Sequence, residues 1–192
     1  KYDIIYIGQG SEDNLELART DILNRKEEFK KYIESNKLLL LTGNSMDLFG
    51  NYIEVNDEKL ETLNIFDYYT KLSNSFDFKN ASTDRIVGEV TCTTNLIKEK
   101  IIGFQNRCDQ NFNIKDSLFT IDEKYSNDGL NNQEGFTYKN VYATHIIGPL
   151  LIRNPYLTDY LLNKVCKSKK LKYKSLDVTA KEAYKKYLEN FN

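Results

Sequence analysis

The segment that decides the fold is YDIIYIGQGSED (2–13), a helical pattern from Asn14 to Ile33, and LLLLTGNSMDLFG (38–50). Residues 2–7 and 38–42 are short apolar runs with the length of buried strands. Between them, apolar residues recur at helical spacing opposite a charged face, which predicts one amphipathic helix of about five turns. Strand, loop, helix, strand, turn and helix in this order are typical of a right-handed βαβ unit in a parallel sheet.

The rest of the chain predicts more strands and two further helices. Strands are expected at 86–92 and 100–104 and within 138–147, and helices at 155–167 and 176–191. Pro155 suits the first turn of its helix, where no backbone N–H is needed. We expect a mobile polar loop at 74–84 and a solvated connector in the lysine run 167–174. Together these patterns predict an α/β fold with a single domain over residues 1–192.

Composition and charge exclude several classes of protein. The 192 residues carry 27 basic and 28 acidic side chains, a net charge of -1, which gives no attraction toward nucleic acid or an anionic membrane. The longest apolar run, 38–41, is far below the ~20 residues of a membrane span. Cys92, Cys108 and Cys166 have no paired spacing, which argues against a disulfide framework and a zinc site. A cytosolic domain without metal or cofactor is expected.

Two segments are candidates for chemistry. Gly43-x-Ser45-x-Asp47 follows a buried strand and loosely resembles the turn that presents a serine nucleophile. The alternative is a tight turn with a capping Ser or Asn. His145, the one histidine, precedes Gly148-Pro149 and is either a general base or a buried side chain bonded to a backbone carbonyl. Both alternatives stay open for each segment.

A series of motifs runs along nearly the whole chain. They are Tyr2–Asp13, Leu63–Thr70, Asp84–Glu89, Ile102–Asn106, Glu134–Asn140 and GPLL with Asn154. In type and order they resemble the class I glutamine amidotransferases of the cobyric acid synthase (CobB/CobQ) type, and most of all their GatD subgroup. The resemblance implies a three-layer, flavodoxin-like sandwich with a mostly parallel sheet, helices on both faces and added antiparallel strands. The family's first strand and helix have no counterpart before Tyr2.

The catalytic positions of that family are substituted in this sequence. The resemblance places its cysteine nucleophile on Gly43 and its histidine base on Ile147, with His145 at a tyrosine position. In the family, the middle glycine of the first loop helps to hold the oxyanion, and in this sequence Gln9 stands at that position. Glycine has no atom to attack with and isoleucine accepts no proton, so the thioester route lacks both groups.

Some residues are candidates to replace those groups or to bind substrate. Ser45, His145 and Cys108 could substitute for the lost pair, whereas Cys92 and Cys166 are expected to be buried and inert. The resemblance assigns glutamine binding to Arg85 with the loop Gly8, Gln9 and Gly10. The Arg85 guanidinium could clamp an α-carboxylate through two hydrogen bonds, or it could form a surface salt bridge.

The sequence therefore leads to one leading hypothesis and two alternatives. The leading one is a catalytically degenerate GatD-like subunit that forms a heterodimer with a Mur ligase-like synthetase in peptidoglycan precursor modification. The first alternative is an active glutaminase that supplies ammonia to a synthetase of the lipid II isoglutaminyl or cobyric acid type. The second is a non-catalytic sensor of glutamine or another small amino acid.

Overall fold

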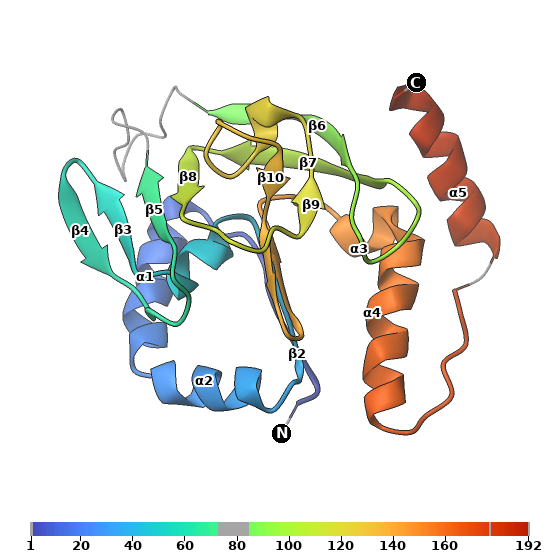
Figure 1. Cartoon of the computed structure of the whole chain (residues 1–192), viewed down its shortest axis with the longest axis horizontal. Coiled ribbons are helices and arrows are strands. Elements are labelled where there is room, and N and C mark those ends of the chain that lie inside the picture. The colour runs from blue at the N-terminus through green and yellow to red at the C-terminus, as the bar shows by residue number, and fades with distance from the viewer. Residues whose placement is uncertain (1, 73–84, 177, 192) are drawn as a thin grey trace.

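The computed structural model describes residues 2–72, 85–176 and 178–191 (Figure 1). The predicted loop 74–84 lies outside these residues. The strands are β1 Ile4–Ile7, β2 Leu38–Thr42, β3 Tyr52–Val55, β4 Glu58–Glu61, β5 Tyr69–Leu72, β6 Ile86–Cys92, β7 Ile101–Arg107, β8 Asp109–Phe112, β9 Phe119–Thr120, β10 Gln133–Glu134, β11 Phe136–Tyr138 and β12 Val141–Thr144. The α-helices are α1 Glu12–Leu23, α2 Lys26–Glu34, α3 Leu150–Arg153, α4 Pro155–Ser168 and α5 Val178–Leu188, and the 3₁₀ helices are η1 Gly43–Phe49, η2 Glu123–Tyr125 and η3 Glu189–Phe191.

The central sheet has the strand order β1-β2-β12-β11. β2 pairs in parallel with β1 on one side and with β12 on the other, and β11 joins β12 in antiparallel orientation. The predicted parallel βαβ unit is therefore confirmed. All five residues of β2 are buried, as expected for the middle strand of a sheet covered on both faces.

Each face of the central sheet packs against its own hydrophobic core. Leu38 and Leu40 point into a cluster with Leu157 and Leu161 of α4. Leu39 and Leu41 alternate to the other face, where the cluster includes residues from α1, α2 and η1. Figure 1 shows α1 and α2 on one side of β2 and α4 on the other. Helices on both faces of the parallel sheet are thus confirmed.

The predicted five-turn helix is wrong, because the segment forms two helices. Ser11 caps α1 by accepting a hydrogen bond from the Asn14 N–H at 3.3 Å, and α1 ends at Leu23. Arg25 has φ -108° and ψ 11°, which is not helical, before α2 begins at Lys26. The break lets Ile22 and Ile33 contact the same core, so tertiary packing outweighs the continuous helical pattern.

The mostly parallel arrangement holds only for the central sheet. The sheets β4-β3-β5-β8, β6-β7 and β9-β10 are joined by antiparallel pairs, except that β3 pairs with β5 in parallel. In the β3–β4 hairpin, Asn56 and Asp57 both have positive φ, at 49° and 66°. Two such residues form the tight turn whose twist suits a hairpin, and they fix the antiparallel pairing.

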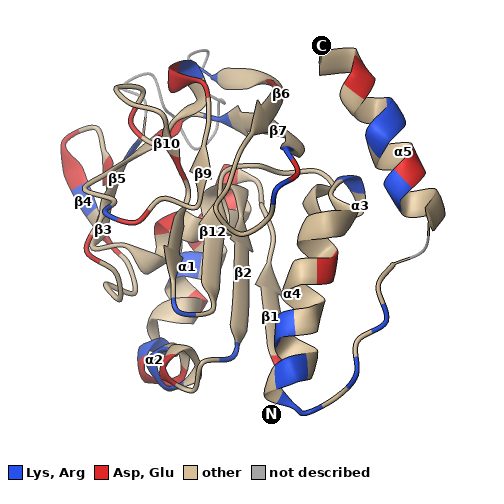
Figure 2. Ribbon diagram, turned by 45° about the vertical axis from the view of Figure 1, so that its right-hand side comes forward, with Lys and Arg blue, Asp and Glu red and all other residues tan. Residues whose placement is uncertain are grey.

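The other predicted elements lie close to their expected positions. β6 has the predicted bounds, β7 extends past the predicted end to Arg107, and α4 begins at Pro155. The lysine-rich stretch 167–174 is exposed apart from a half-buried Tyr173. Its first two residues end α4, and the rest belongs to the chain segment that leads from α4 toward α5, where the ribbon has several blue stretches (Figure 2). Among the described helices, none has the length and apolar character to cross a bilayer.

Candidate functional site

β2 leads directly into the 3₁₀ helix η1, and the first residue after the strand is Gly43, which has no side chain. Gly43, directly after β2, has φ +62°. A Cβ at this position would lie 2.6 Å from Gln9 Cβ and 2.8 Å from Gln9 Oε1. Gln9 therefore fills the space that a side chain at position 43 would need.

Ser45 and Asn44 stabilise this turn. The buried Ser45 hydroxyl lies 2.9 Å from the carbonyl oxygens of both Ile7 and Thr42. Asn44 accepts a hydrogen bond from the Gly10 N–H at 3.1 Å and donates one to the Gly10 carbonyl at 3.0 Å. The tight turn is present, but the predicted capping role is wrong, because no side chain caps η1 at Thr42. Ser45 and Asn44 instead join the turn to Ile7 and Gly10.

An open cleft of about 840 Å³ lies beside the turn. Arg85, Ile147 and the loop Gly8–Gly10, which the sequence analysis singled out, line this cleft. The other lining residues are Tyr6, Ser11, Glu12, Asn14, Thr42, Asn106 and Gly148. Gly43, Ser45 and His145 do not line it. The cleft thus unites the predicted binding residues with the predicted base position, but neither of the predicted substitutes Ser45 and His145 faces it.

The Arg85 guanidinium in this cleft already has partners. It donates to Glu12 Oε1 at 2.9 Å and to Asn106 Oδ1 at 2.7 Å. Burial lowers the pKa of Arg85, but the hydrogen bond and charge of Glu12 outweigh that effect and raise it. The predicted salt-bridge alternative is therefore present, and Glu12 would compete with a ligand carboxylate for Arg85.

His145 lies in a buried network of charged side chains behind the cleft. Its Nδ1 is 3.2 Å from Glu134 Oε1, and its Nε2 is 3.0 Å from Asp109 Oδ2. Glu134 also accepts hydrogen bonds from the His145 N–H and from the Thr144 hydroxyl, each at 2.7 Å. The prediction of a buried histidine is confirmed, but its partners are carboxylates rather than a backbone carbonyl.

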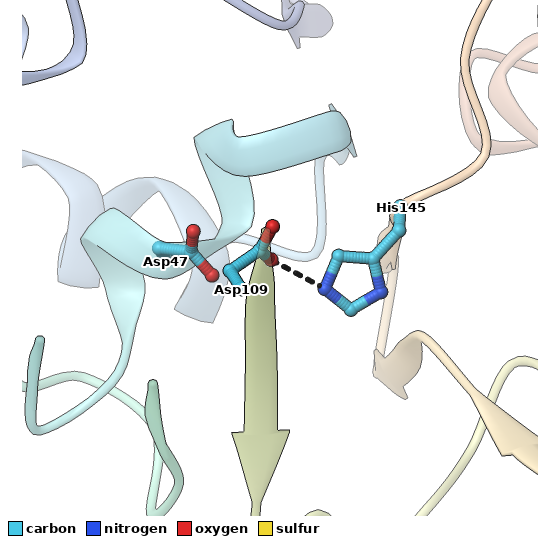
Figure 3. Close-up of side chains that lie close together, drawn as sticks. All are labelled: Asp47, Asp109 and His145. Atoms are coloured by element: carbon cyan, nitrogen blue, oxygen red, sulfur yellow. Dashed lines mark ion pairs between the residues drawn. The ribbon is translucent and has the colours of Figure 1, made fainter. Parts of the chain in front are cut away.

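Asp47 and Asp109 belong to the same network (Figure 3). Burial and the charge of Asp109 raise the pKa of Asp47 to about 8. Burial alone would raise the pKa of Asp109, but the charges of His145 and Arg107 lower it to about 2. Burial and Arg107 lower the pKa of His145, whereas Asp109 and Glu134 raise it more strongly. Within this network, burial and the neighbouring charges therefore favour the protonated form of Asp47, the ionised form of Asp109 and the protonated form of His145.

Comparison with known proteins connects this architecture to a family. No protein-family model matches the chain. The chain is 30% identical over 177 residues to subunit GatD of lipid II isoglutaminyl synthase (glutamine-hydrolyzing) from Staphylococcus aureus (strain N315). The matched region covers 92% of this chain and 69% of that subunit. The chain belongs to the GatD family. It is also 26% identical over 172 residues to the same subunit from Streptococcus pneumoniae (strain ATCC BAA-255 / R6), covering 88% of the chain and 63% of that subunit.

Several residues of the GatD-like motifs have structural roles here. The buried Asn154 side chain accepts from the Ile102 N–H at 2.8 Å and donates to the Ile102 and Leu150 carbonyls at 2.7 and 2.8 Å. Gly135 has φ +63°, and a Cβ there would lie 2.1 Å from the Ala143 carbonyl oxygen. These motif positions hold strands and helices together. The motifs shared with the GatD family are therefore stronger evidence for a shared fold than for a shared reaction.

Cys108 is the one thiol close to the cleft of this GatD-family chain. It lines a small cavity beside the cleft with Arg85, Asp47 and Asp109, and its Sγ lies 3.9 Å from Glu12 Oε1. A thiol and a proton acceptor are thus within reach of each other. Burial and the charge of Asp109 raise the pKa of Cys108 to about 12, whereas a nucleophilic thiolate needs a lowered pKa. Cys92 is buried as predicted, but Cys166 is only half-buried.

We expect Cys108 to react slowly with an alkylating reagent at pH 8. With a pKa of about 12, its thiolate is scarce, and even after allowance for greater intrinsic nucleophilicity the rate should be roughly a hundredfold below that of a free thiol. Time-resolved mass spectrometry of peptides after iodoacetamide treatment measures this rate. The partly exposed Cys166 serves as the internal comparison, and labelling of Cys108 as fast as Cys166 contradicts the expectation.

Sequence reasoning missed most of the buried network. The sequence does not single out Asp109 or Glu134 as site residues, and Asp47 enters only as part of the turn motif. These three residues come from β8, β10 and η1, elements that are far apart in the sequence. The motif beginning at Glu134 was the one signal that pointed toward them.

Proposed function

We propose that this chain is a GatD-like subunit without glutaminase activity, which binds a Mur ligase-like synthetase that amidates a peptidoglycan precursor in the cytoplasm. The observation that carries the proposal is the turn at Gly43. Its tip has no nucleophilic atom, and Gln9 occupies the space where one would stand. The subunit then contributes by binding its partner and shaping the amidation site rather than by releasing ammonia.

The groups near the cleft support this proposal. Hydrolysis of glutamine through a thioester needs a thiolate and a base that protonates the leaving ammonia. Ile147 lines the cleft where the family's base is expected, and His145 is held between two carboxylates outside the lining. Ser45 is turned toward backbone carbonyls. None of these three residues offers an activated pair at the turn.

One specific observation favours the sensor alternative. The 840 Å³ cleft contains Arg85 and the Gly8–Gly10 loop, which could hold an amino acid without turnover. In that case the ligand carboxylate replaces Glu12 on Arg85. Glutamine would then raise the melting temperature of the chain without ammonia release, because a ligand that binds only the native state stabilises it by mass action.

The decisive experiment compares nitrogen sources in the reconstituted complex with the Mur ligase-like synthetase. Ammonium chloride should support amidation of the precursor, whereas glutamine should give no product above a reaction without a nitrogen source. Lipid II amidation is followed by mass spectrometry, and free ammonia by a coupled dehydrogenase assay. Co-elution of the two subunits in size-exclusion chromatography tests the partner separately.

Two outcomes would overturn the proposal. One is glutamine-dependent amidation that Ser45→Ala or Cys108→Ala abolishes, with Cys166→Ala as the matched control. The other is covalent labelling of any residue by a diazo-ketone analogue of glutamine, which would establish the active glutaminase alternative.

A further inference from the structure

Three buried side chains converge on one point inside the protein. Asp47 comes from η1, Asp109 from the start of β8, and His145 follows the end of β12 (Figure 3). Their exposed fractions are 0%, 3% and 1%. Among the described residues, Asp47 Oδ2 has no hydrogen-bond partner, and His145 Nε2 and Asp109 Oδ2, which are 3.0 Å apart, have none besides each other. Buried polar atoms are rarely left in this state.

We propose that Asp47, Asp109 and His145 bind a divalent transition-metal cation, with Zn²⁺ as the ion tested first. Three candidate ligand atoms, one from each residue, lie within 4.8 Å of one another. Ligand atoms around a tetrahedral Zn²⁺ lie roughly 3.4 Å apart, given bond lengths near 2.1 Å. The three atoms would therefore have to approach one another by at most about 1.4 Å to coordinate the ion.

The surrounding hydrogen bonds orient these ligands. Glu134 Oε1 lies 3.2 Å from His145 Nδ1, so Nδ1 can donate its proton to Glu134 and leave the Nε2 lone pair free. Asp47 Oδ1 accepts hydrogen bonds from Thr70 Oγ1 at 3.0 Å and from Asn111 Nδ2 at 2.9 Å. A carboxylate behind a ligating histidine is a recurrent feature of metal centres, because it fixes the ring tautomer and orientation.

The charge of the network favours a dication. With a neutral His145, the carboxylates of Asp47, Asp109 and Glu134 and the guanidinium of Arg107 sum to a charge of -2, and all these side chains are buried. Buried charges are normally paired or coordinate a metal, because isolation from water is costly. A dication neutralises the network, whereas the metal-free protein must take up protons instead.

The donor set and the adjacent space indicate the kind of metal. An imidazole nitrogen with two carboxylate oxygens suits Zn²⁺ and its neighbours, whereas Mg²⁺ and Ca²⁺ prefer oxygen ligands alone. Asp47 and Asp109 also line a cavity of about 20 Å³, which has room for one water molecule as a further ligand. The cysteine spacing gave no sign of this site because its ligands are not cysteines.

Metal binding to the intact chain tests the proposal independently of the proposed function. The purified protein is stripped with a chelator and titrated with Zn²⁺ by calorimetry and with Co²⁺ by visible absorption. We expect one ion per chain, d–d absorption bands typical of low coordination number, and a rise in melting temperature with added Zn²⁺. The cobalt spectrum of the unaltered protein needs no variant.

Variants then assign the ligands. Asp47→Asn and His145→Gln should each weaken Zn²⁺ binding by at least about a hundredfold, and Glu134→Gln by roughly ten- to a hundredfold. Asp67→Asn is the matched control, since the Asp67 side chain is 67% exposed and pairs with Lys115 on the surface. Circular dichroism verifies the fold of each variant. The proposal fails if the unaltered protein binds no Zn²⁺ or Co²⁺, if it prefers Mg²⁺ or Ca²⁺, or if Asp47→Asn binds Zn²⁺ like the control.

Discussion

Replacing Glu134 by alanine is expected to lower the free energy of unfolding by about 3 to 5 kcal/mol. Glu134 is fully buried and accepts hydrogen bonds from the Thr144 hydroxyl and the His145 N–H, both at 2.7 Å. It also faces His145 Nδ1 at 3.2 Å. Its removal leaves these donors without partners in the interior, and the cost of these uncompensated polar groups adds to that of the cavity.

Urea denaturation followed by circular dichroism, in the presence of a chelator, measures this change. Glu182→Ala provides a matched control, because Glu182 is exposed on α5 and its loss should change the stability by no more than about 0.5 kcal/mol. Glu134→Gln keeps the size and part of the hydrogen bonding, so it should cost less than alanine. Equal unfolding midpoints for Glu134→Ala and Glu182→Ala would contradict the central position of Glu134.

Gly43→Cys is expected to destabilise the chain by about 2 to 4 kcal/mol, although it restores the residue type that the family resemblance places there. A non-glycine residue at φ +62° costs about 1 kcal/mol or more. The new Cβ would in addition lie 2.6 Å from Gln9 Cβ, and such overpacking typically costs 1 to 3 kcal/mol. Thermal and urea unfolding of the single variant measure the loss.

A double-variant cycle isolates the contact with Gln9. Gln9→Gly removes the side chain that crowds position 43, so Gln9→Gly/Gly43→Cys should regain roughly 1 to 2 kcal/mol relative to the sum of the single changes. Gln9→Gly/Ser45→Ala is a control that alters the same turn without placing a Cβ at position 43. Strictly additive effects in the first pair would show that Gln9 does not fill the nucleophile position.

Local patterns located most of the elements. The predicted strands 2–7 and 38–42 are neighbouring parallel strands, the first of which starts at Ile4, and Pro155 marks the start of α4. Burial and proline geometry act over a few residues, so local patterns reveal them. The break between α1 and α2 could not be seen in this way. The helical pattern continues through Asn24 and Arg25, and the break follows from how both helices pack on one core.

The sequence by itself determined the parallel βαβ unit and the GatD-like order of motifs, and it predicts that Gly43 and Ile147 stand at the family's cysteine and histidine positions. These conclusions depend on residue types and on short-range spacing, which are read directly from the chain. Only the tertiary structure decided that Gln9 fills the space beside Gly43 and that Glu12 forms an ion pair with Arg85. It also decided that Asp47, Asp109 and His145 meet in the interior. Such contacts join residues from distant elements, and their positions depend on how the sheets and helices pack together.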